Sequence, residues 1–191
     1  TGDKPLPPLT RAGLAHLYFV SIHPYEDGNG RIARALAEKA LAQAIGQPTL
    51  LALSHTIQRG RKAYYDALEA NNKTMEVTGW LTYFAEAVLA AQSHSQSMID
   101  FLIEKTKLFD RLRGKLNERQ DRVLTRMFRE GPAGFKGGLS AANYITITGA
   151  SRATATRDLA QLVDMGALTV TGMLKATRYS LNISAQAAGR G

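Results

Sequence analysis

The chain of 191 residues contains no cysteine, which excludes a disulfide scaffold, a thiolate nucleophile and a cysteine-ligated zinc site. The same absence favours a reducing compartment, and we expect a cytoplasmic protein. No apolar run approaches the roughly 20 residues that a membrane-spanning helix needs, so no membrane partner is expected. The first residues, Thr1-Gly-Asp-Lys-Pro-Leu-Pro-Pro8, lack the basic-then-apolar pattern of a signal peptide. Because the sequence begins without Met, we expect it to be part of a longer chain.

Acidic residues are sparse in the second half of the chain. Residues 1–100 carry 9 Lys and Arg against 9 Asp and Glu, whereas residues 101–191 carry 15 against 7, so the net charge of +8 lies entirely in the second half. This asymmetry indicates two domains, the second with a surface suited to a polyanion. A basic domain that is merely soluble is the alternative. The 45% of apolar residues suffices for a packed core.

Helical patterns dominate the sequence. Helices are predicted from an N-cap at Thr10 to just before Pro24 and over residues 31–45, 54–71, 78–91 and 95–107. Beyond residue 120, three helical segments are followed by two strand-like segments, 167–170 and 177–183, that form a hairpin. The predicted fold class is therefore mainly α. A helical bundle (1–110) and a charged linker (111–119) precede a small α+β winged helix-turn-helix domain (120–191).

The segment His23-Pro-Tyr-Glu-Asp-Gly-Asn-Gly-Arg-Ile-Ala-Arg34, called the signature segment below, lies between the first two predicted helices. Gly28, Asn29 and Gly30 tolerate left-handed backbone angles. Successive amides in such a turn can converge on an anion, and the turn opens into a helix N-terminus with partial positive charge. The backbone of the signature segment therefore predicts a phosphate site.

Four side chains of the signature segment add chemistry to this backbone. Arg31 and Arg34 lie on neighbouring positions of one helix face and can reach the same anion. Asp27 offers a carboxylate oxygen of the kind that Mg²⁺ takes beside substrate phosphates. His23 is the natural proton acceptor near neutral pH. Each feature alone is usually a turn, a cap or a core residue, but their occurrence together predicts a catalytic phosphate site.

The signature segment resembles that of the Fic family, His-Pro-Phe-x-Asp/Glu-Gly-Asn-Gly-Arg-x-x-Arg, and departs from it only at Tyr25, where the family has Phe. The resemblance implies a Fic-type helical bundle that transfers AMP from ATP to a Ser, Thr or Tyr hydroxyl of a target protein. It assigns the general base to His23 and the Mg²⁺ ligand to Asp27. It assigns the triphosphate contacts to Gly28, Asn29, Gly30, Arg31 and Arg34.

Residues 64–72 resemble the family segment that lines the nucleoside pocket. The resemblance makes Tyr64, Tyr65 and Asn72 candidate contacts of adenine and ribose, although paired tyrosines on a helix are equally well explained by packing. His16 is expected in the core or just behind the site. His55 and His94 are expected to be solvent-facing or structural.

Two features common in the family have no counterpart in this sequence. Only 22 residues precede His23, and Pro5, Pro7 and Pro8 leave little room for a hairpin flap. The inhibitory pattern Ser/Thr-x-x-x-Glu-Gly/Asn is also missing, with Glu130-Gly131 as its nearest match. We expect both features in a missing N-terminal segment or on a partner chain, and a homodimer is one possible assembly. We therefore expect this chain to bind ATP with Mg²⁺ but to modify target proteins poorly.

The helix predicted after Ser151 is placed like a recognition helix, with Arg152, Thr154, Thr156 and Arg157 as candidate DNA contacts. Use of this domain in protein packing is the alternative. Two other functions stay open beside AMP transfer. One is a DNA-binding regulator whose Fic core senses a nucleotide. The other is a Fic enzyme that removes AMP or transfers another phosphate-containing group.

Overall fold

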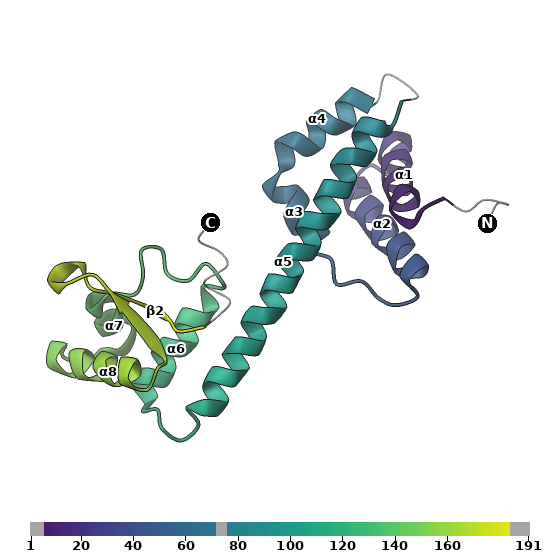
Figure 1. Ribbon diagram of the computed structural model, residues 1–191. Helices are drawn as coiled ribbons and strands as arrows, with labels where there is room; N and C mark the ends of the chain where they lie inside the picture. Colours follow the sequence, from purple (N-terminus) through teal and green to yellow (C-terminus); the bar gives the residue numbers. More distant parts are fainter. Residues whose placement is uncertain (1–5, 72–75, 184–191) are drawn as a thin grey trace. The chain divides into compact units, whose positions relative to one another are not determined.

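The computed structural model describes residues 6–71 and 76–183 (Figure 1). It divides into two compact units, unit 1 (Thr1–Gln96) and unit 2 (Ser97–Gly191). Most of the described chain is helical, and its one regular sheet has two antiparallel strands, so the predicted mainly α class with a small β part is confirmed. None of the helices in the described ranges is both long and apolar enough to cross a membrane.

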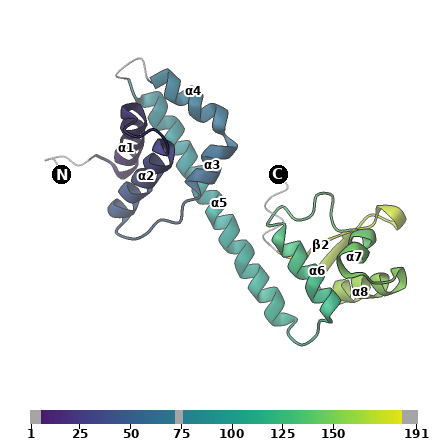
Figure 2. The ribbon, with the colours of Figure 1, turned by 180° about the vertical axis from the view of Figure 1, so that it is seen from behind.

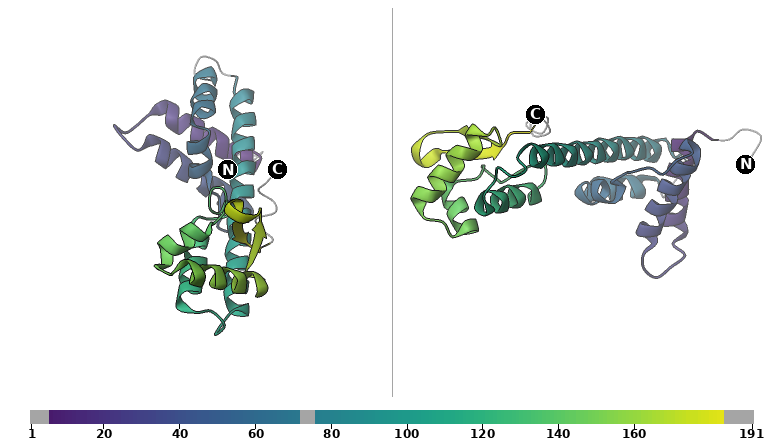
Figure 3. Two further views of the ribbon diagram at one scale, coloured as in Figure 1. Left: turned by 90° about the vertical axis from the view of Figure 1, so that its left-hand side faces the viewer. Right: turned by 90° about the horizontal axis from the view of Figure 1, so that it is seen from below.

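Unit 1 is built from four helices and the first part of a fifth. These are α1 (Pro8–Ile22), α2 (Asn29–Ile45), α3 (Leu53–Arg59), α4 (Arg61–Asn71) and α5 (Thr78–Arg111). Helices α1 and α2 pack against each other as a hairpin, and Figure 3 shows the segment that joins them at its tip. The core contains the buried side chains Leu17, Leu41, Leu53, Ile57, Leu68, Trp80 and Phe84.

Three helix boundaries of unit 1 differ from the prediction. Helix α1 begins at Pro8, not after Thr10, because proline in the first turn loses no intrahelical hydrogen bond. The helix predicted over 54–71 is interrupted at Gly60, which separates α3 from α4. The two helices predicted between residues 78 and 107 form one helix of 34 residues, since neither Gly nor Pro interrupts the sequence between them.

Unit 2 begins within α5, before the segment 111–119 that was predicted as the linker. The reason is that Phe101, Leu108 and Leu112 pack into the core of unit 2. The unit continues with α6 (Glu118–Arg129), α7 (Ala141–Thr148), α8 (Arg152–Asp164), β1 (Leu168–Thr171), η1 (Leu174–Ala176) and β2 (Arg178–Leu181).

The strands β1 and β2 pair antiparallel with Leu168 opposite Leu181, and an isolated bridge joins Leu139 to Tyr179. Figure 2 shows α6, α7, α8 and the hairpin of the two strands from behind. Three helices followed by a hairpin is the element order predicted from the sequence. The assignment of this unit as a winged helix-turn-helix domain stays a prediction.

A buried carboxylate links α6, α7 and α8 of unit 2 through hydrogen bonds. Asp158 of α8 accepts hydrogen bonds from Arg119 Nε (2.8 Å), Asn117 Nδ2 (3.1 Å) and the Tyr144 hydroxyl (2.9 Å). Burial by itself would raise the pKa of Asp158, but these hydrogen bonds outweigh burial and the pKa is lowered. The same network raises the pKa of Tyr144, through burial first and then through its bond to the carboxylate.

Candidate active site

The signature segment begins with a left-handed residue. His23 follows α1 with φ 50° and ψ 55°, and its N–H donates to the Phe19 carbonyl at 3.1 Å. Left-handed angles cost a residue with a Cβ about 1–2 kcal/mol, and histidine accepts them more readily than most residues do. His23 is exposed and is the first residue of the segment that joins α1 to α2. The backbone therefore presents this imidazole to solvent in the short segment that leads into α2.

Helix α2 begins at Asn29, two residues earlier than predicted. Its N-cap is Gly28 with φ 87°, which a side chain would rarely adopt, and no side chain caps the helix. In the described structure, the amides of the first turn (Asn29, Gly30 and Arg31) therefore receive no side-chain cap. Uncapped amides at a helix N-terminus favour an anion.

Asn29 has a role that the sequence did not indicate. Its side chain is buried, accepts from the Tyr25 N–H at 3.1 Å and donates to the Tyr25 carbonyl. The two bonds close the turn between α1 and α2. Each polar atom of this side chain thus has one partner within the turn, the amide nitrogen keeps a second N–H, and the predicted contact of the side chain with phosphate stays a prediction. The backbone amide of Asn29 still belongs to the uncapped first turn.

Both arginines of the signature segment fold back over its glycines. A Cβ placed on Gly28 would lie 3.4 Å from Arg31 Nη2, and one on Gly30 would lie 3.5 Å from Arg34 Nη1. Two guanidinium groups thus approach the same short stretch of backbone whose amides are uncapped. Cations are unfavourable at a helix N-terminus, and a bound anion would offset this unfavourable interaction.

The Asp27 carboxylate accepts hydrogen bonds from two donors of the signature segment. Its Oδ1 accepts from the Gly28 N–H at 2.6 Å, and its Oδ2 accepts from Arg31 Nη2 at 3.1 Å. The side chains of Arg31 and Asp27 are 72% and 92% exposed, so this ion pair contributes little to stability. A phosphate bound at the turn would compete with the carboxylate for both donors.

The donor set fits Mg²⁺ held by one protein carboxylate together with substrate phosphates, which is a common arrangement for this ion. Asp27 is exposed beside the predicted phosphate site, and each of its oxygens keeps a further lone pair. Among residues 6–71 and 76–183, no three His, Asp or Glu side chains form a cluster. Asp27 stays the candidate Mg²⁺ ligand of the signature segment.

Arg34 differs from Arg31 in its partner. Its Nε donates to the Ser54 hydroxyl of α3 at 2.9 Å, and within the described residues it forms no ion pair. Ser54 lies 20 positions along the chain and belongs to no motif, so only the fold reveals this contact. Sequence reasoning missed Ser54 for that reason.

Behind Arg34 lies a buried aromatic cluster. The imidazole of His16 is fully buried and stacks on Trp80 at a centroid distance of 5.3 Å, with its Nε2 3.1 Å from the Tyr64 hydroxyl. Burial, and then the positive charge of Arg34, lower the pKa of His16 to about 4, so it is neutral at pH 7. His16 Nδ1 has no hydrogen-bond partner among the described groups. The expected placement of His16, in the core or behind the site, agrees with this structure.

The expectation for Tyr64 is corrected. Its side chain is 4% exposed because it packs on Trp80 and bonds to His16, so it cannot contact a nucleoside directly. Burial raises the pKa of Tyr64 to about 12. Tyr65 is 52% exposed, with the Arg61 guanidinium 5.5 Å from its ring centroid, and it stays a candidate nucleoside contact. Asn72 lies outside the described residues.

The candidate DNA contacts lie near the start of α8. Arg152, Thr156 and Arg157 are exposed, whereas Thr154 is half-buried and its N–H donates to the N-cap Ser151 hydroxyl. The Ser151 cap thus occupies the Thr154 amide. Of the four candidate contacts, two arginines and one threonine are thus exposed, and the helix also exposes Gln161 and Asp164.

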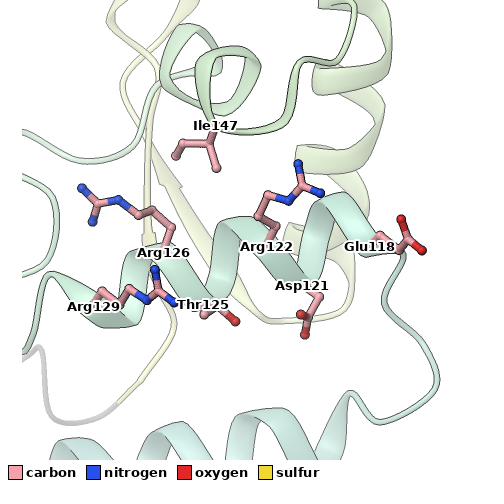
Figure 4. Close-up of a pocket in the computed structure, with 7 residues that line it drawn as sticks. All are labelled: Glu118, Asp121, Arg122, Thr125, Arg126, Arg129 and Ile147. Atoms are coloured by element: carbon pink, nitrogen blue, oxygen red, sulfur yellow. The ribbon is translucent and has the colours of Figure 1, made fainter.

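A cavity of about 450 Å³ lies along α6 (Figure 4). It is lined by Glu118, Asp121, Arg122, Thr125, Arg126, Arg129 and Ile147. Figure 4 shows the Glu118 and Asp121 carboxylates toward one end of the helix and the Arg126 and Arg129 guanidinium groups toward the other, with Arg122 on the half of the carboxylates. The lining contains no histidine and no glycine turn, so we place the candidate active site at the signature segment instead.

Comparison with known proteins identifies the same region. A family model described as "Fic/DOC family" matches residues 2–41. "Protein adenylyltransferase Fic" of Aedes aegypti is 38% identical over 66 residues, which are 35% of this chain and 12% of that protein, and the Culex quinquefasciatus protein of the same name gives equal values. "Protein adenylyltransferase fic-1" of Caenorhabditis elegans is 35% identical over 65 residues, which are 34% of this chain. The matched segment thus spans 12% of the length of these relatives.

Proposed function

We propose, on the premise of the Fic/DOC-family match over residues 2–41, that the protein transfers AMP from ATP to a hydroxyl side chain of a target protein. The observation that carries the proposal is the convergence of uncapped amides and two guanidinium groups beside an exposed imidazole. The names of the matched relatives, which are adenylyltransferases, support the same activity.

In the proposed reaction, the oxygen of the target hydroxyl forms a bond to the α-phosphorus of ATP. The bond from that phosphorus to the bridging oxygen breaks, and pyrophosphate leaves with its negative charge. His23 takes the hydroxyl proton as the general base. The first-turn amides of α2 bind the α- and β-phosphates and stabilise the charge that develops on pyrophosphate, and Arg31 and Arg34 bind the β- and γ-phosphates.

Asp27 is the residue that would hold Mg²⁺, which supplies charge neutralisation at the phosphates when it is bound. Tyr65 is proposed as a nucleoside contact. The reverse removal of AMP and the transfer of another phosphate-containing group would use the same residues, and of these the experiment below distinguishes transfer of the γ-phosphate of ATP.

Transfer is tested by incubating the chain with a cell lysate and ATP labelled at the α or the γ phosphate. AMP transfer predicts slow incorporation of the α label and none of the γ label. Incorporation of the γ label would show phosphorylation and refute the proposal. A protein that only senses nucleotide would incorporate neither label above the level of the His23→Ala variant.

Replacement of Asp27 by asparagine is expected to change nucleotide binding in opposite directions with and without metal. Without Mg²⁺, removal of the carboxylate frees Arg31 and the Gly28 amide for phosphate, so ATP binds about 2–5-fold more tightly, as expected for the loss of an exposed ion pair. With Mg²⁺, the variant binds ATP more weakly than the wild type, because the metal ligand is lost. Isothermal titration in EDTA and in Mg²⁺ measures both effects.

The matched control is Glu26→Gln, which removes the same charge at the neighbouring position. An equal gain in metal-free affinity in this control would show a general charge effect. Weaker binding of Asp27→Asn under both conditions would contradict the competition of Asp27 with phosphate.

Binding of duplex DNA by unit 2 is proposed as a second function. Its support is the exposed pair Arg152 and Arg157 on α8, in the half of the chain that carries the whole positive net charge. Fluorescence anisotropy with labelled DNA should give an affinity that falls steeply with salt. The Arg152→Ala/Arg157→Ala variant should reduce the salt slope by about 2.

The charge-matched control for DNA binding is Arg122→Ala/Arg129→Ala on α6, which should leave most of the slope intact. Equal effects of the two double variants would show a nonspecific charge effect. The absence of binding at low salt would refute this second function.

A further inference from the structure

One edge of the Arg34 guanidinium is held by a hydrogen bond to a neighbouring helix. Its Nε donates to Ser54 Oγ at 2.9 Å, while its Nη1 faces Gly30, at 3.5 Å from the position that a Cβ would take there. Ser54 is the second residue of α3, and Gly30 is the second residue of α2. The guanidinium thus has one end fixed on α3 and the other directed at the uncapped turn.

The anchor of Arg34 is neutral, and this distinguishes it from Arg31. Arg31 faces the Asp27 carboxylate, which cancels part of its charge. A serine hydroxyl fixes the direction of a guanidinium without neutralising it, so the full charge stays available to a phosphate. Glu38, one turn further along α2, forms no ion pair with Arg34 in the described structure; burial raises the pKa of Glu38, and the charge of Arg34 opposes that rise.

Ser54 is itself held in place on both sides. The Ala52 N–H, just before α3, donates to the Ser95 hydroxyl of α5 at 3.0 Å. His55 stacks on His94 of α5 with ring centroids 4.2 Å apart and an interplanar angle of 10°. Both contacts lie within unit 1. The start of α3 is therefore fixed at residues 52 and 55, and Ser54 between them is a defined anchor point.

We propose that Ser54 is the positioning residue for Arg34 and orients its guanidinium toward the β- and γ-phosphates of the bound nucleotide. The proposal rests on the proposed function, because it requires a nucleotide at the signature segment. Ser54 does not touch the reacting atoms, so its loss should weaken nucleotide binding more than it slows the chemical step.

The test compares the binding of ATP and AMP, each with Mg²⁺, to the whole chain by isothermal titration. Ser54→Ala should weaken ATP binding about fivefold, the effect of one hydrogen bond, and should leave AMP binding unchanged because AMP has no β- or γ-phosphate. Ser54→Thr keeps the hydroxyl and should restore ATP binding to within about twofold of the wild type. Gln58→Ala on the same helix is the control and should change neither affinity.

Ser54→Asp separates positioning from stability. A carboxylate in the first turn of α3 favours the helix, so the melting temperature should not fall. The same carboxylate would pair with Arg34 and neutralise it, so ATP binding should weaken more than in Ser54→Ala. If Ser54 were merely structural, the melting temperature and the ATP affinity of Ser54→Asp would change in the same direction, both falling or both rising. That result would overturn the proposal.

The Arg34→Ala variant separates a failure of the positioning role of Ser54 from a failure of the proposed contact between Arg34 and phosphate. If Arg34→Ala weakens ATP binding and Ser54→Ala does not, the positioning role is refuted and the nucleotide site stands. If Arg34→Ala leaves ATP binding unchanged, the proposed contact of Arg34 with phosphate fails, and the role of Ser54 fails with it. If KM for ATP rises in Ser54→Ala with kcat within about twofold, positioning is supported.

Discussion

Replacement of His23 by alanine is expected to slow AMP transfer by about 10²–10⁴-fold, the usual contribution of a general base. The imidazole is exposed beside the turn where the phosphates are proposed to bind, so its removal leaves the backbone amides and both arginines in place. ATP affinity should therefore stay within about twofold of the wild type while the rate falls. Incorporation of α-labelled AMP and isothermal titration measure the two quantities.

The backbone at His23 supplies controls that separate chemistry from folding. Its φ of 50° suits glycine and asparagine better than alanine. His23→Gly and His23→Asn should therefore lose transfer as fully as His23→Ala, with no loss of stability. For His23→Gly, relief of the left-handed strain should raise stability by about 1 kcal/mol. Transfer at the wild-type rate in any of the three variants would contradict the role of His23.

The second large effect is expected at Asp158. Replacement by alanine removes a buried acceptor from Arg119, Asn117 and the buried Tyr144 hydroxyl. Breaking a buried ion pair from one side costs about 3–5 kcal/mol, and the partial exposure of Arg119 places this loss near the lower end. Urea unfolding followed by circular dichroism measures it. Arg157→Ala, one position away and exposed, should change stability by less than about 0.5 kcal/mol.

The contribution of Asp158 to the free energy of unfolding decreases as the pH is lowered. Because folding lowers the pKa of this carboxyl, its contribution is complete above the unfolded value near 4 and is lost as the pH falls through the folded value. The difference in stability between wild type and Asp158→Ala should therefore narrow below about pH 4. A difference that is smaller than about 1 kcal/mol at pH 7, or that is unchanged on acidification, would contradict the structural role of this network.

Because of His16, we expect unit 1 to lose stability on acidification before the Asp158 network does. The folded pKa of about 4 lies below the usual value of 6.5, so protonation favours the unfolded state as the pH falls between these values. Trp80 is the single tryptophan of the chain and packs on His16, so its fluorescence reports on this unit. Unit 1 should therefore weaken at a higher pH than the Asp158 network does.

The sequence predicted the signature segment because its chemistry is local. Gly28 must adopt positive φ, and the residues from His23 to Arg34 are close in sequence, so the turn and the helix that follows bring them together. The helical class and the C-terminal hairpin were predicted for a similar reason, since periodicity and glycine positions are local signals. These parts of the prediction needed no tertiary contact.

Contacts between distant segments were not predictable in the same way. Ser54 approaches Arg34 only because α3 packs beside α2, and no pattern in the sequence marks it. Tyr64 and Tyr65 are adjacent, yet tertiary packing buries the first against Trp80 and leaves the second exposed. The Asn29 side chain is engaged by Tyr25 because the turn geometry closes on it.

The central claim is that a nucleoside triphosphate binds at the start of α2 beside His23. The most direct measurement is an NMR titration of the ¹⁵N-labelled chain with ATP and Mg²⁺. The account predicts that the largest amide shifts fall on Gly28, Asn29, Gly30 and Arg31 and that the His23 ring resonances shift with them. Saturating ATP that leaves these signals unmoved, or that shifts only residues of unit 2, would contradict the account.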